Sequence, residues 1–276
     1  MVEVIDMITD AISENVSKSE SESEYMGEDG LLHCGVCHRK TQVEIEFLGK
    51  KKKVRCICDC EKKELDAHKE KERQEELERQ RRICFAETNM VNWTFENDDG
   101  KNAKLSEAMK NYVKNFTDFK KDGKGLLLYG TVGTGKTYYA ACIANSLIDQ
   151  GYSVLMTNFA RLTNQIQGRF EDKQEFIDSI NKYTLLIIDD LGAERKSDFM
   201  QEMVFNIIDS RYRSGLPFII TTNLTAEEIK KPQEICYSRI YDRVLERCFP
   251  IEVTGVSRRR QSVHDTFFEV KEKLGL

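Results

Sequence analysis

One eight-residue segment, Gly130 to Thr137, concentrates three glycines, three threonines and a lysine. It reads GTVGTGKT and fits the pattern G-x-x-x-x-G-K-[ST], in which glycines let successive backbone N–H groups turn toward phosphate oxygens. Lys136 is then expected to reach the β- and γ-phosphates of a nucleotide, and the Thr137 hydroxyl to ligate Mg²⁺. The predicted nucleotide-binding residues are Gly130, Thr131, Val132, Gly133, Thr134, Gly135, Lys136 and Thr137.

Two carboxylates, Asp189 and Asp190, follow directly on the apolar run 185–188. Such a run predicts a buried strand, and ligands of open α/β sheets bind at the carboxyl ends of the strands. Asp189 is expected to hold Mg²⁺, directly or through water, and Asp190 to orient or deprotonate an attacking water. Asn223, after the apolar run 217–222, can hydrogen-bond that water or the γ-phosphate, although an Asn-initiated turn is an equally ordinary interpretation.

Five of the nine cysteines lie close together, as Cys-x-x-Cys at 34–37 and Cys-x-Cys-x-Cys at 56–60. Two ligand pairs flanking a β-prone stretch are typical of a zinc ribbon, in which four thiolates hold Zn²⁺ tetrahedrally. Five cysteines compete for four places, and His33 and His38 are within reach; unligated thiols and a redox pair are the weaker alternatives. The candidate zinc ligands are Cys34, Cys37, Cys56, Cys58 and Cys60, while the other cysteines are expected to be packing residues.

The elements that would position these groups alternate between apolar runs and helical patterns from residue 125 onward. Uninterrupted apolar strands alternating with helices predict an α/β fold with a parallel sheet covered on both faces. Strands are expected at 125–129, 153–157, 183–188 and 217–222, and helices at 137–150, 159–170, 198–213 and 225–230. This order places the phosphate-binding segment between a strand and a helix, as its mechanism requires.

Charged residues are distributed unevenly along the rest of the chain. Residues 1–30 hold nine acidic residues and one basic residue, and their Ser-Glu alternation predicts an acidic, disordered tail. One short piece of it has the spacing of an amphipathic helix that docks on a partner, through Val4, Ile5, Ile8 and Ile12. The further assignments are a zinc-binding domain at 31–62, a charged, solvent-exposed linker helix at 63–89 and the nucleotide-binding domain at 90–276.

Overall composition excludes several classes of protein. No stretch approaches the roughly 18 uncharged apolar residues of a membrane span, and the acidic N-terminus lacks the basic start of a secretory signal. A cytoplasmic protein that does not contact membranes is therefore expected. The net charge of -5 argues against an indiscriminate nucleic-acid binder. That average hides a net +3 outside the tail, because residues 1–30 alone carry -8, so local phosphate contacts are still possible.

Residues 90–276 resemble the AAA+ ATPases, specifically the helicase-loader family that includes DnaC and the IstB-like proteins. The resemblance is carried by the phosphate-binding segment, by LLIIDDLGAER at 185–195, by Thr221-Thr222-Asn223 and by the arginine-rich run 239–259. It implies a five-stranded parallel sheet, Asn223 as sensor 1, Arg243 as a finger acting on ATP of a neighbouring subunit, and Arg259 as sensor 2. Competitors for these arginine roles are Arg239, Arg247 and Arg258. The predicted catalytic residues are Asp190, Asn223, Arg243 and Arg259.

The resemblance implies an ATPase with ATP, Mg²⁺ and Zn²⁺ as cofactors that associates with its own copies through the arginine-finger interface. Its expected activity is to load a replicative hexameric helicase onto single-stranded DNA. The alternative is an ATP-gated adaptor such as an IstB-like transposition helper, and the cysteine cluster favours the loader. A small-molecule kinase is disfavoured by Asn223 and by the arginines beyond residue 239.

Two finer expectations follow from the resemblance. Asp190 is shorter than the glutamate that most AAA+ motors carry, which predicts slow hydrolysis in the absence of partners. The family also uses the helix expected at 158–170 for single-stranded DNA, with bases stacking on aromatic rings. The candidate side chains there are Arg161, Asn164, Gln165, Gln167, Arg169, Phe159 and Phe170.

Overall fold

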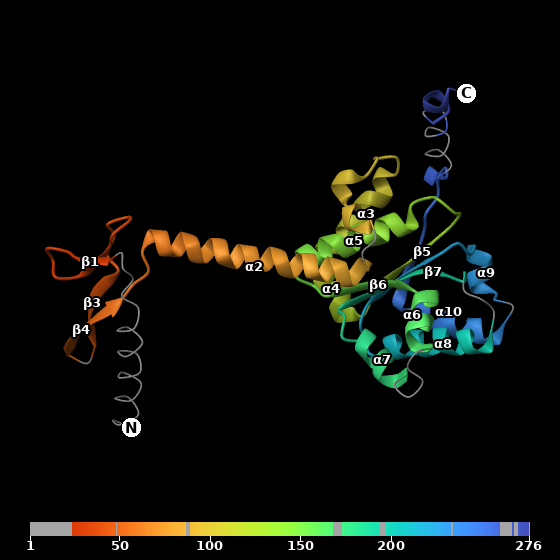
Figure 1. Cartoon of the computed structure of the whole chain (residues 1–276). Coiled ribbons are helices and arrows are strands. Elements are labelled where there is room, and N and C mark those ends of the chain that lie inside the picture. Colours follow the sequence, from red (N-terminus) through yellow and green to blue (C-terminus); the bar gives the residue numbers. More distant parts are fainter. Residues whose placement is uncertain are drawn as a thin grey trace. The chain divides into compact units, whose positions relative to one another are not determined.

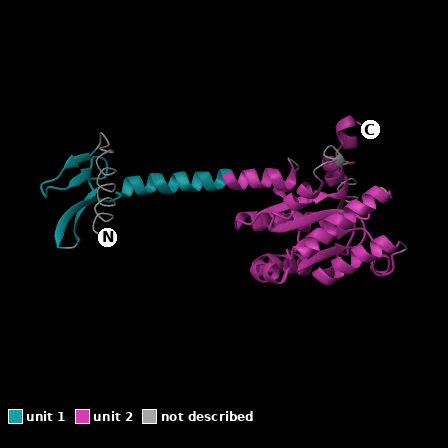
Figure 2. Cartoon of the chain, turned by 90° about the horizontal axis from the view of Figure 1, so that it is seen from below, with its two compact units in different colours: residues 1–75 teal, residues 76–276 magenta. Residues whose placement is uncertain are grey.

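The structure is a computed structural model of the 276-residue chain, which divides into two compact units (Figures 1 and 2). Unit 1 comprises residues 1–75 and unit 2 residues 76–276. The structure describes residues 24–47, 49–86, 89–167, 173–193, 197–232, 234–259, 267 and 270–275. The acidic segment 1–23, with its predicted amphipathic helix, lies outside the described residues. None of the described helices has both the length and the apolar character needed to cross a bilayer.

Unit 1 contains two small antiparallel strand pairs. Strand β1 (Glu24–Met26) pairs with β2 (Leu32–Cys34), and β3 (Gln42–Phe47) pairs with β4 (Lys50–Arg55). Residues 24–26, which the sequence analysis assigned to the acidic tail, hydrogen-bond to a strand of the cysteine-rich module. Few side chains of this unit are buried, so a bound metal would have to supply much of its folding free energy.

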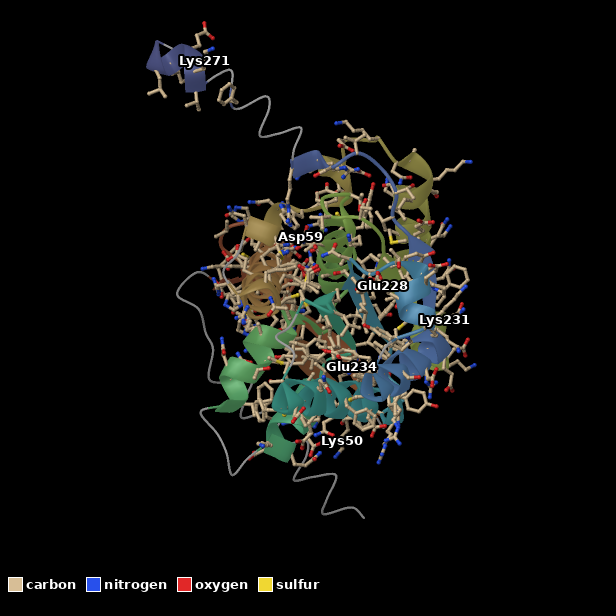
Figure 3. The ribbon with its side chains drawn as sticks, turned by 90° about the vertical axis from the view of Figure 1, so that its right-hand side faces the viewer. Lys50, Asp59, Glu228, Lys231, Glu234 and Lys271 are labelled. Atoms are coloured by element: carbon tan, nitrogen blue, oxygen red, sulfur yellow. The ribbon has the colours of Figure 1, made fainter. Side chains whose placement is uncertain are left out.

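Helix α2 (Asp59–Phe85) begins and ends earlier than the predicted linker helix at 63–89. Asp59, labelled in Figure 3, starts it with an acidic first turn, which the helix dipole favours. Pairs such as Arg79 with Glu76, 2.8 Å apart, support its exposed middle. Its last turns are not solvent-exposed as predicted, because Cys84 and Phe85 are buried in a core of unit 2.

The five-stranded parallel sheet of unit 2 confirms the predicted α/β class, and its strand order is β6-β7-β8-β5-β9. Its strands are β5 (Gly125–Tyr129), β6 (Val154–Asn158), β7 (Leu185–Leu191), β8 (Phe218–Thr222) and β9 (Cys248–Glu252). Its helices are α3 (Ala103–Lys114), α4 (Phe116–Asp122), α5 (Lys136–Asp149), α6 (Phe159–Gln167), α7 (Lys173–Ile180), α8 (Asp198–Arg213), α9 (Ala226–Lys230) and α10 (Ile235–Arg247). Short 3₁₀ turns, η1 (Asn89–Asn92) and η2 (Phe95–Asn97), precede α3.

Helices cover both faces of this sheet, as uninterrupted apolar strands require (Figure 1). Alternate residues of β5 enter opposite cores: Leu126 and Leu128 pack with α3, α4 and α5, whereas Leu127 packs with α6 to α10. Helix α9 begins with a capping box, in which Thr225 and Glu228 cap each other's backbone N–H groups. Glu228 is labelled in Figure 3. Strands β7, β8 and β5 are consecutive in the sheet and parallel, so their carboxyl ends lie side by side.

A buried arginine hydrogen-bonds to the segments that lead into two strands. Arg211 of α8 is 0% exposed, and its guanidinium donates to the carbonyl oxygens of Tyr183 at 2.8 Å, Thr184 at 2.9 Å and Pro217 at 2.7 Å. These residues lead into β7 and β8. Burial lowers the pKa of Arg211 to about 10, yet three carbonyl oxygens compensate for the desolvated charge.

Candidate nucleotide-binding site

The segment 130–135 forms a tight loop between β5 and α5. Gly133 and Gly135 have φ values of 85° and 104°, in the left-handed region that favours glycine. A Cβ on Gly133 would collide with the Ser257 side chain, which adds to the strain that another residue would meet at this φ. Thr134 is 4% exposed and donates its hydroxyl to the Thr131 carbonyl at 3.0 Å. The loop backbone therefore curls ahead of the N-terminus of α5, whose dipole favours an anion.

Lys136, the first residue of α5, folds back into this loop. Its Nζ donates to the carbonyl oxygens of Gly130 at 2.9 Å and Thr131 at 2.8 Å, and the residue is 5% exposed. Burial lowers the pKa of Lys136, an effect that the charges of Asp190 and Asp189 oppose. An ammonium group in this position can exchange its two carbonyl partners for phosphate oxygens, which are stronger acceptors.

Thr137 and Asp189 meet across 52 positions of sequence. The Thr137 hydroxyl donates to Asp189 Oδ1 at 2.9 Å, and the Thr221 hydroxyl donates to the same oxygen at 2.6 Å. Burial raises the pKa of Asp189, partly offset by these two hydrogen bonds. A hydroxyl beside a half-buried carboxylate is a donor set that suits Mg²⁺, so the residues present fit the ion that the sequence predicts.

Asp190, unlike Asp189, is exposed and has a hydrogen-bond partner of its own. A bulge between β7 and β8 interrupts the register after Ile188, and Asp190 has φ of 59°. Asp tolerates this left-handed conformation better than most residues. The exposed Asp190 carboxylate accepts a hydrogen bond at 2.9 Å from the Asn223 amide, at the end of β8. Asp190 and Asn223 are therefore paired as a polar couple next to the loop.

Lys136, Thr137, Asp190 and Asn223 line one pocket of about 330 Å³. Arg258 and Arg259 join them there, as does the only tryptophan of the chain, Trp93. Arg258 Nη2 lies 2.9 Å from Asp99 Oδ1, and its guanidinium lies over the rings of Tyr138 and Tyr139. Of the two neighbouring arginines, Arg259 is the more exposed, as the predicted sensor 2 would need to be.

Arg243, the predicted finger, does not line this pocket. Its Nε donates to Asp209 Oδ1 at 2.7 Å and its guanidinium lies 4.8 Å from the centre of the Phe205 ring. Arg247 lies over Tyr212, while Arg239 is exposed. The structure thus separates α10 from the pocket of its own chain, and a role for Arg243 at another subunit's ATP stays a prediction.

Four of the five candidate cysteines converge in unit 1. The sulfur atoms of Cys34, Cys37, Cys58 and Cys60 all lie within 4.8 Å of one another. Cys56 is outside this group, and its Sγ donates to the Lys40 carbonyl at 3.3 Å. Hydrogen bonding with Cys37 raises the pKa of Cys60 to about 12, an effect to which burial adds. Four cysteine sulfurs this close together fit Zn²⁺, which four thiolates can hold tetrahedrally.

The two histidines near the cysteines have other partners. His33 lies 3.0 Å from Asp29 Oδ1 through Nε2 and 3.2 Å from the His38 carbonyl through Nδ1. His38 Nδ1 lies 3.2 Å from the Tyr25 hydroxyl. Both histidines therefore support the fold of the module, and the cysteines 34, 37, 58 and 60 are the group among the described residues that could hold a metal ion.

Helix α6 agrees only in part with the DNA-binding expectation. Phe159 is 2% exposed and packs in a core, so its ring is not available for base stacking, contrary to that expectation. Arg161 is exposed and remains a candidate for a phosphate contact. The predicted Arg169 and Phe170 lie outside the described residues.

Several site residues were not singled out by the sequence analysis. Trp93 and Asp99 lie before the phosphate-binding segment and belong to no motif, yet one lines the pocket and the other contacts Arg258. Asp209 is an ordinary acid on an amphipathic helix, and only folding reveals it as the partner of Arg243. An unusual signal was present for Trp93 alone, because it is the single tryptophan.

Comparison with known proteins identifies relatives of this chain. The chain is 25% identical over 190 residues to "Replicative helicase loader DnaI" of Bacillus subtilis (strain 168), covering 63% of this chain and 61% of the relative. It is 29% identical over 163 residues to "Replicative helicase loader DnaC" of Escherichia coli (strain K12), covering 55% and 63%. The chain thus spans about three fifths of the length of these curated relatives.

The fold comparison and the family comparison agree. "Crystal structure of the DnaC helicase loader" matches with a TM-score of 0.52 at 23% identity, covering 60% of this chain and 100% of that one, which shows a shared fold. The family model described as "IstB-like ATP binding protein" matches residues 45–266. Because this match covers well over half of the sequence, the chain belongs to the IstB-like ATP binding protein family.

Proposed function

We propose that this protein binds and slowly hydrolyses ATP and loads a replicative hexameric helicase onto single-stranded DNA. The observation that carries the ATPase part is the convergence on one pocket of a phosphate-binding loop, Thr137 and the Asp190–Asn223 couple, with Asp189 hydrogen-bonded to Thr137. The helicase-loading part is supported by the names of the two relatives.

Each group then has a chemical role. Loop N–H groups and Lys136 bind the phosphates, while the Asp190–Asn223 couple orients the attacking water in line with the γ-phosphate. Mg²⁺ held by Thr137 and Asp189 would neutralise charge on the phosphate oxygens. Arg259 meets the γ-phosphate in its own subunit, and Arg243 supplies a cation to the ATP of a neighbouring subunit. Hydrolysis therefore depends on self-association.

ATP binding can be measured through Trp93, because it lines the pocket and is the only tryptophan. Mg·ATP is expected to change the tryptophan emission of the wild-type chain and to leave that of Lys136→Ala unchanged. Phosphate should be released slowly without any phosphorylated product. A basal turnover of many ATP per second without partners would contradict the assigned role of Asp190.

Loading is tested with a replicative hexameric helicase and circular single-stranded DNA. The wild-type protein with ATP should bind the helicase and increase the number of helicase rings that stay on the circles after a salt wash. Lys136→Ala is the control that keeps unit 1 intact but lacks ATP binding. If the protein ignores the helicase but stimulates a transposase in an ATP-dependent way, the adaptor alternative is correct.

A further inference from the structure

The β3–β4 hairpin of unit 1 has two unlike faces. In an antiparallel pair, directly opposed residues project on the same side and neighbouring pairs alternate. One face therefore carries Glu44 with Lys53 and Glu46 with Lys51. The opposite face, which we call the apolar-basic face, consists of Val43, Ile45, Phe47, Lys50, Lys52 and Val54.

The charged face is turned toward the rest of its unit. Lys53 Nζ donates to the Gly30 carbonyl at 2.6 Å, and Lys51 pairs with Glu44 at 3.0 Å. Arg55, on the same side, lies 3.8 Å from Glu24 of β1 and 3.3 Å from Glu61 of α2. These contacts satisfy the charges and attach the hairpin to its module, leaving the apolar-basic face on the outside.

The apolar-basic face has no cover among the described residues. Ile45 is 45% exposed and Phe47 52%, and Lys50 and Lys52 form no ion pair with any described residue. A two-stranded hairpin with one uncovered apolar side is marginal in water unless something packs on it. An apolar stripe rimmed by lysines selects an apolar and acidic ligand.

The chain itself supplies a segment with this character. Residues 1–16 contain four acidic residues, Glu3, Asp6, Asp10 and Glu14, and no lysine or arginine. On a helix of 100° per residue, four apolar side chains fall within one sector and the acids fall on the other side, with Glu14 nearest its edge. The apolar sector is made by Val4, Ile5, Ile8 and Ile12.

The connection between residues 1–16 and the hairpin is long enough for the two to meet. Residues 17–23 join the segment to Glu24, and seven extended residues reach roughly 25 Å. Glu24 lies beside Arg55, the last residue of β4, so the chain enters the module at the base of the hairpin. The six-residue strands of the hairpin are about 20 Å long, which is within this reach.

We propose that residues 2–16 form an amphipathic helix that packs its apolar sector on the apolar-basic face of the β3–β4 hairpin of the same chain. The lysines of that face flank the helix and attract its acidic edge. A protein that uses this face must then displace the segment. The proposal depends only on unit 1 and is independent of the ATPase and loading functions.

The test is site-specific photocrosslinking in the full-length, zinc-loaded protein. Benzoylphenylalanine placed at position 47 should crosslink to peptides within residues 1–16. The matched control is the same group at position 51, because Lys51 belongs to the same hairpin end but to the opposite face. Mixing unlabelled with ¹⁵N-labelled chains distinguishes crosslinks within one chain from those between two chains.

Two substitutions in the segment sharpen the result. Ile8→Asp, in the apolar sector, should lower the crosslink yield at least about tenfold, whereas Ser13→Asp, on the polar side, should leave most of it. The proposal is overturned if positions 47 and 51 crosslink equally, if Ile8→Asp has no effect, if the crosslinks join two chains, or if position 47 yields none to the segment. Zinc content measured in parallel shows that each variant retains its module.

Discussion

Arg243 and Asp209 are joined by a short ion pair between helices α10 and α8, with Arg243 Nε 2.7 Å from Asp209 Oδ1. Asp209 is 9% exposed, and the rings of Phe205 and Tyr212 lie beside the guanidinium. Arg243 Nη1 also donates to the Arg239 carbonyl at 3.0 Å. The guanidinium is therefore held in one orientation by contacts within its own chain.

This pair leads to a prediction about hydrolysis. Arg243→Ala should leave the ATP-induced change in Trp93 emission intact and lower phosphate release by the assembled protein by roughly 10²–10³-fold, as loss of a transition-state donor does. Asp209→Asn should lower it less, about tenfold, because it loosens the guanidinium without removing it. The double variant should match Arg243→Ala alone, since both act through one group.

Arg213→Ala is the matched control for this pair. Arg213 also contacts Asp209, at 2.7 Å, but its side chain is 74% exposed. Its removal should leave hydrolysis close to wild type. Equal losses in Arg213→Ala and Asp209→Asn would mean that Asp209 supports only the local fold.

Asp189→Asn should retain or raise the Tm of the nucleotide-free protein and abolish the increase in Tm that Mg·ATP gives. Burial raises the pKa of Asp189, so between its ordinary value and this raised pKa the folded chain holds a proton that the unfolded chain releases. The free energy of unfolding therefore falls as pH rises through that window, and the ionised carboxylate remains a cost above it. The asparagine variant lacks this cost and should show an equal or higher Tm without nucleotide.

The same variant should lose the increase in Tm that Mg·ATP gives the wild-type chain, because a neutral amide is a poor Mg²⁺ ligand. Thermal unfolding over a pH series, with and without Mg·ATP, measures both effects. A variant that is less stable at every pH and still gains stability from Mg·ATP would contradict the assigned role of Asp189.

Zinc content should distinguish between the clustered cysteines and their neighbour. Cys34→Ser and Cys58→Ser are expected to abolish the roughly one Zn²⁺ per chain that elemental analysis should find in the wild type. Cys56→Ser, in the same short run but outside the cluster, should retain it. Retention of zinc by Cys58→Ser, or its loss from Cys56→Ser, would contradict the ligand set.

Arg211→Ala should be among the most destabilising substitutions in unit 2. It leaves a cavity and removes the donor from three buried carbonyl oxygens, which should lower the free energy of unfolding by roughly 3–5 kcal/mol. Arg213→Ala, two positions away and exposed, should cost about 0.5 kcal/mol or less. Urea unfolding followed through Trp93 reports on unit 2, and equal midpoints for the two variants would contradict this role.

Local sequence patterns predicted the elements of unit 2 closely. The helix expected at 198–213 has those bounds, and the strand expected at 125–129 matches β5. The phosphate loop could be located because its function requires contiguous residues with fixed backbone conformations. Asp189 and Asn223 could be placed near it because parallel strands end at one edge of a sheet.

Pairings between distant residues could not be predicted in this way. The order of strands, with β5 between β8 and β9, depends on how the helices pack, and the choice of Cys58 and Cys60 over Cys56 depends on where the sulfur atoms converge.

Motif residues and the parallel sheet could be read from the amino-acid order alone, since periodicity and spacing act over a few residues along the chain. The contacts of Asp209 with Arg243, of Asp99 with Arg258 and of Arg211 with carbonyl oxygens depend on folding, which brings distant segments together. The chain has 89 charged residues, and only a few of them form buried pairs. Which residues pair depends on which side chains come close together in the folded chain.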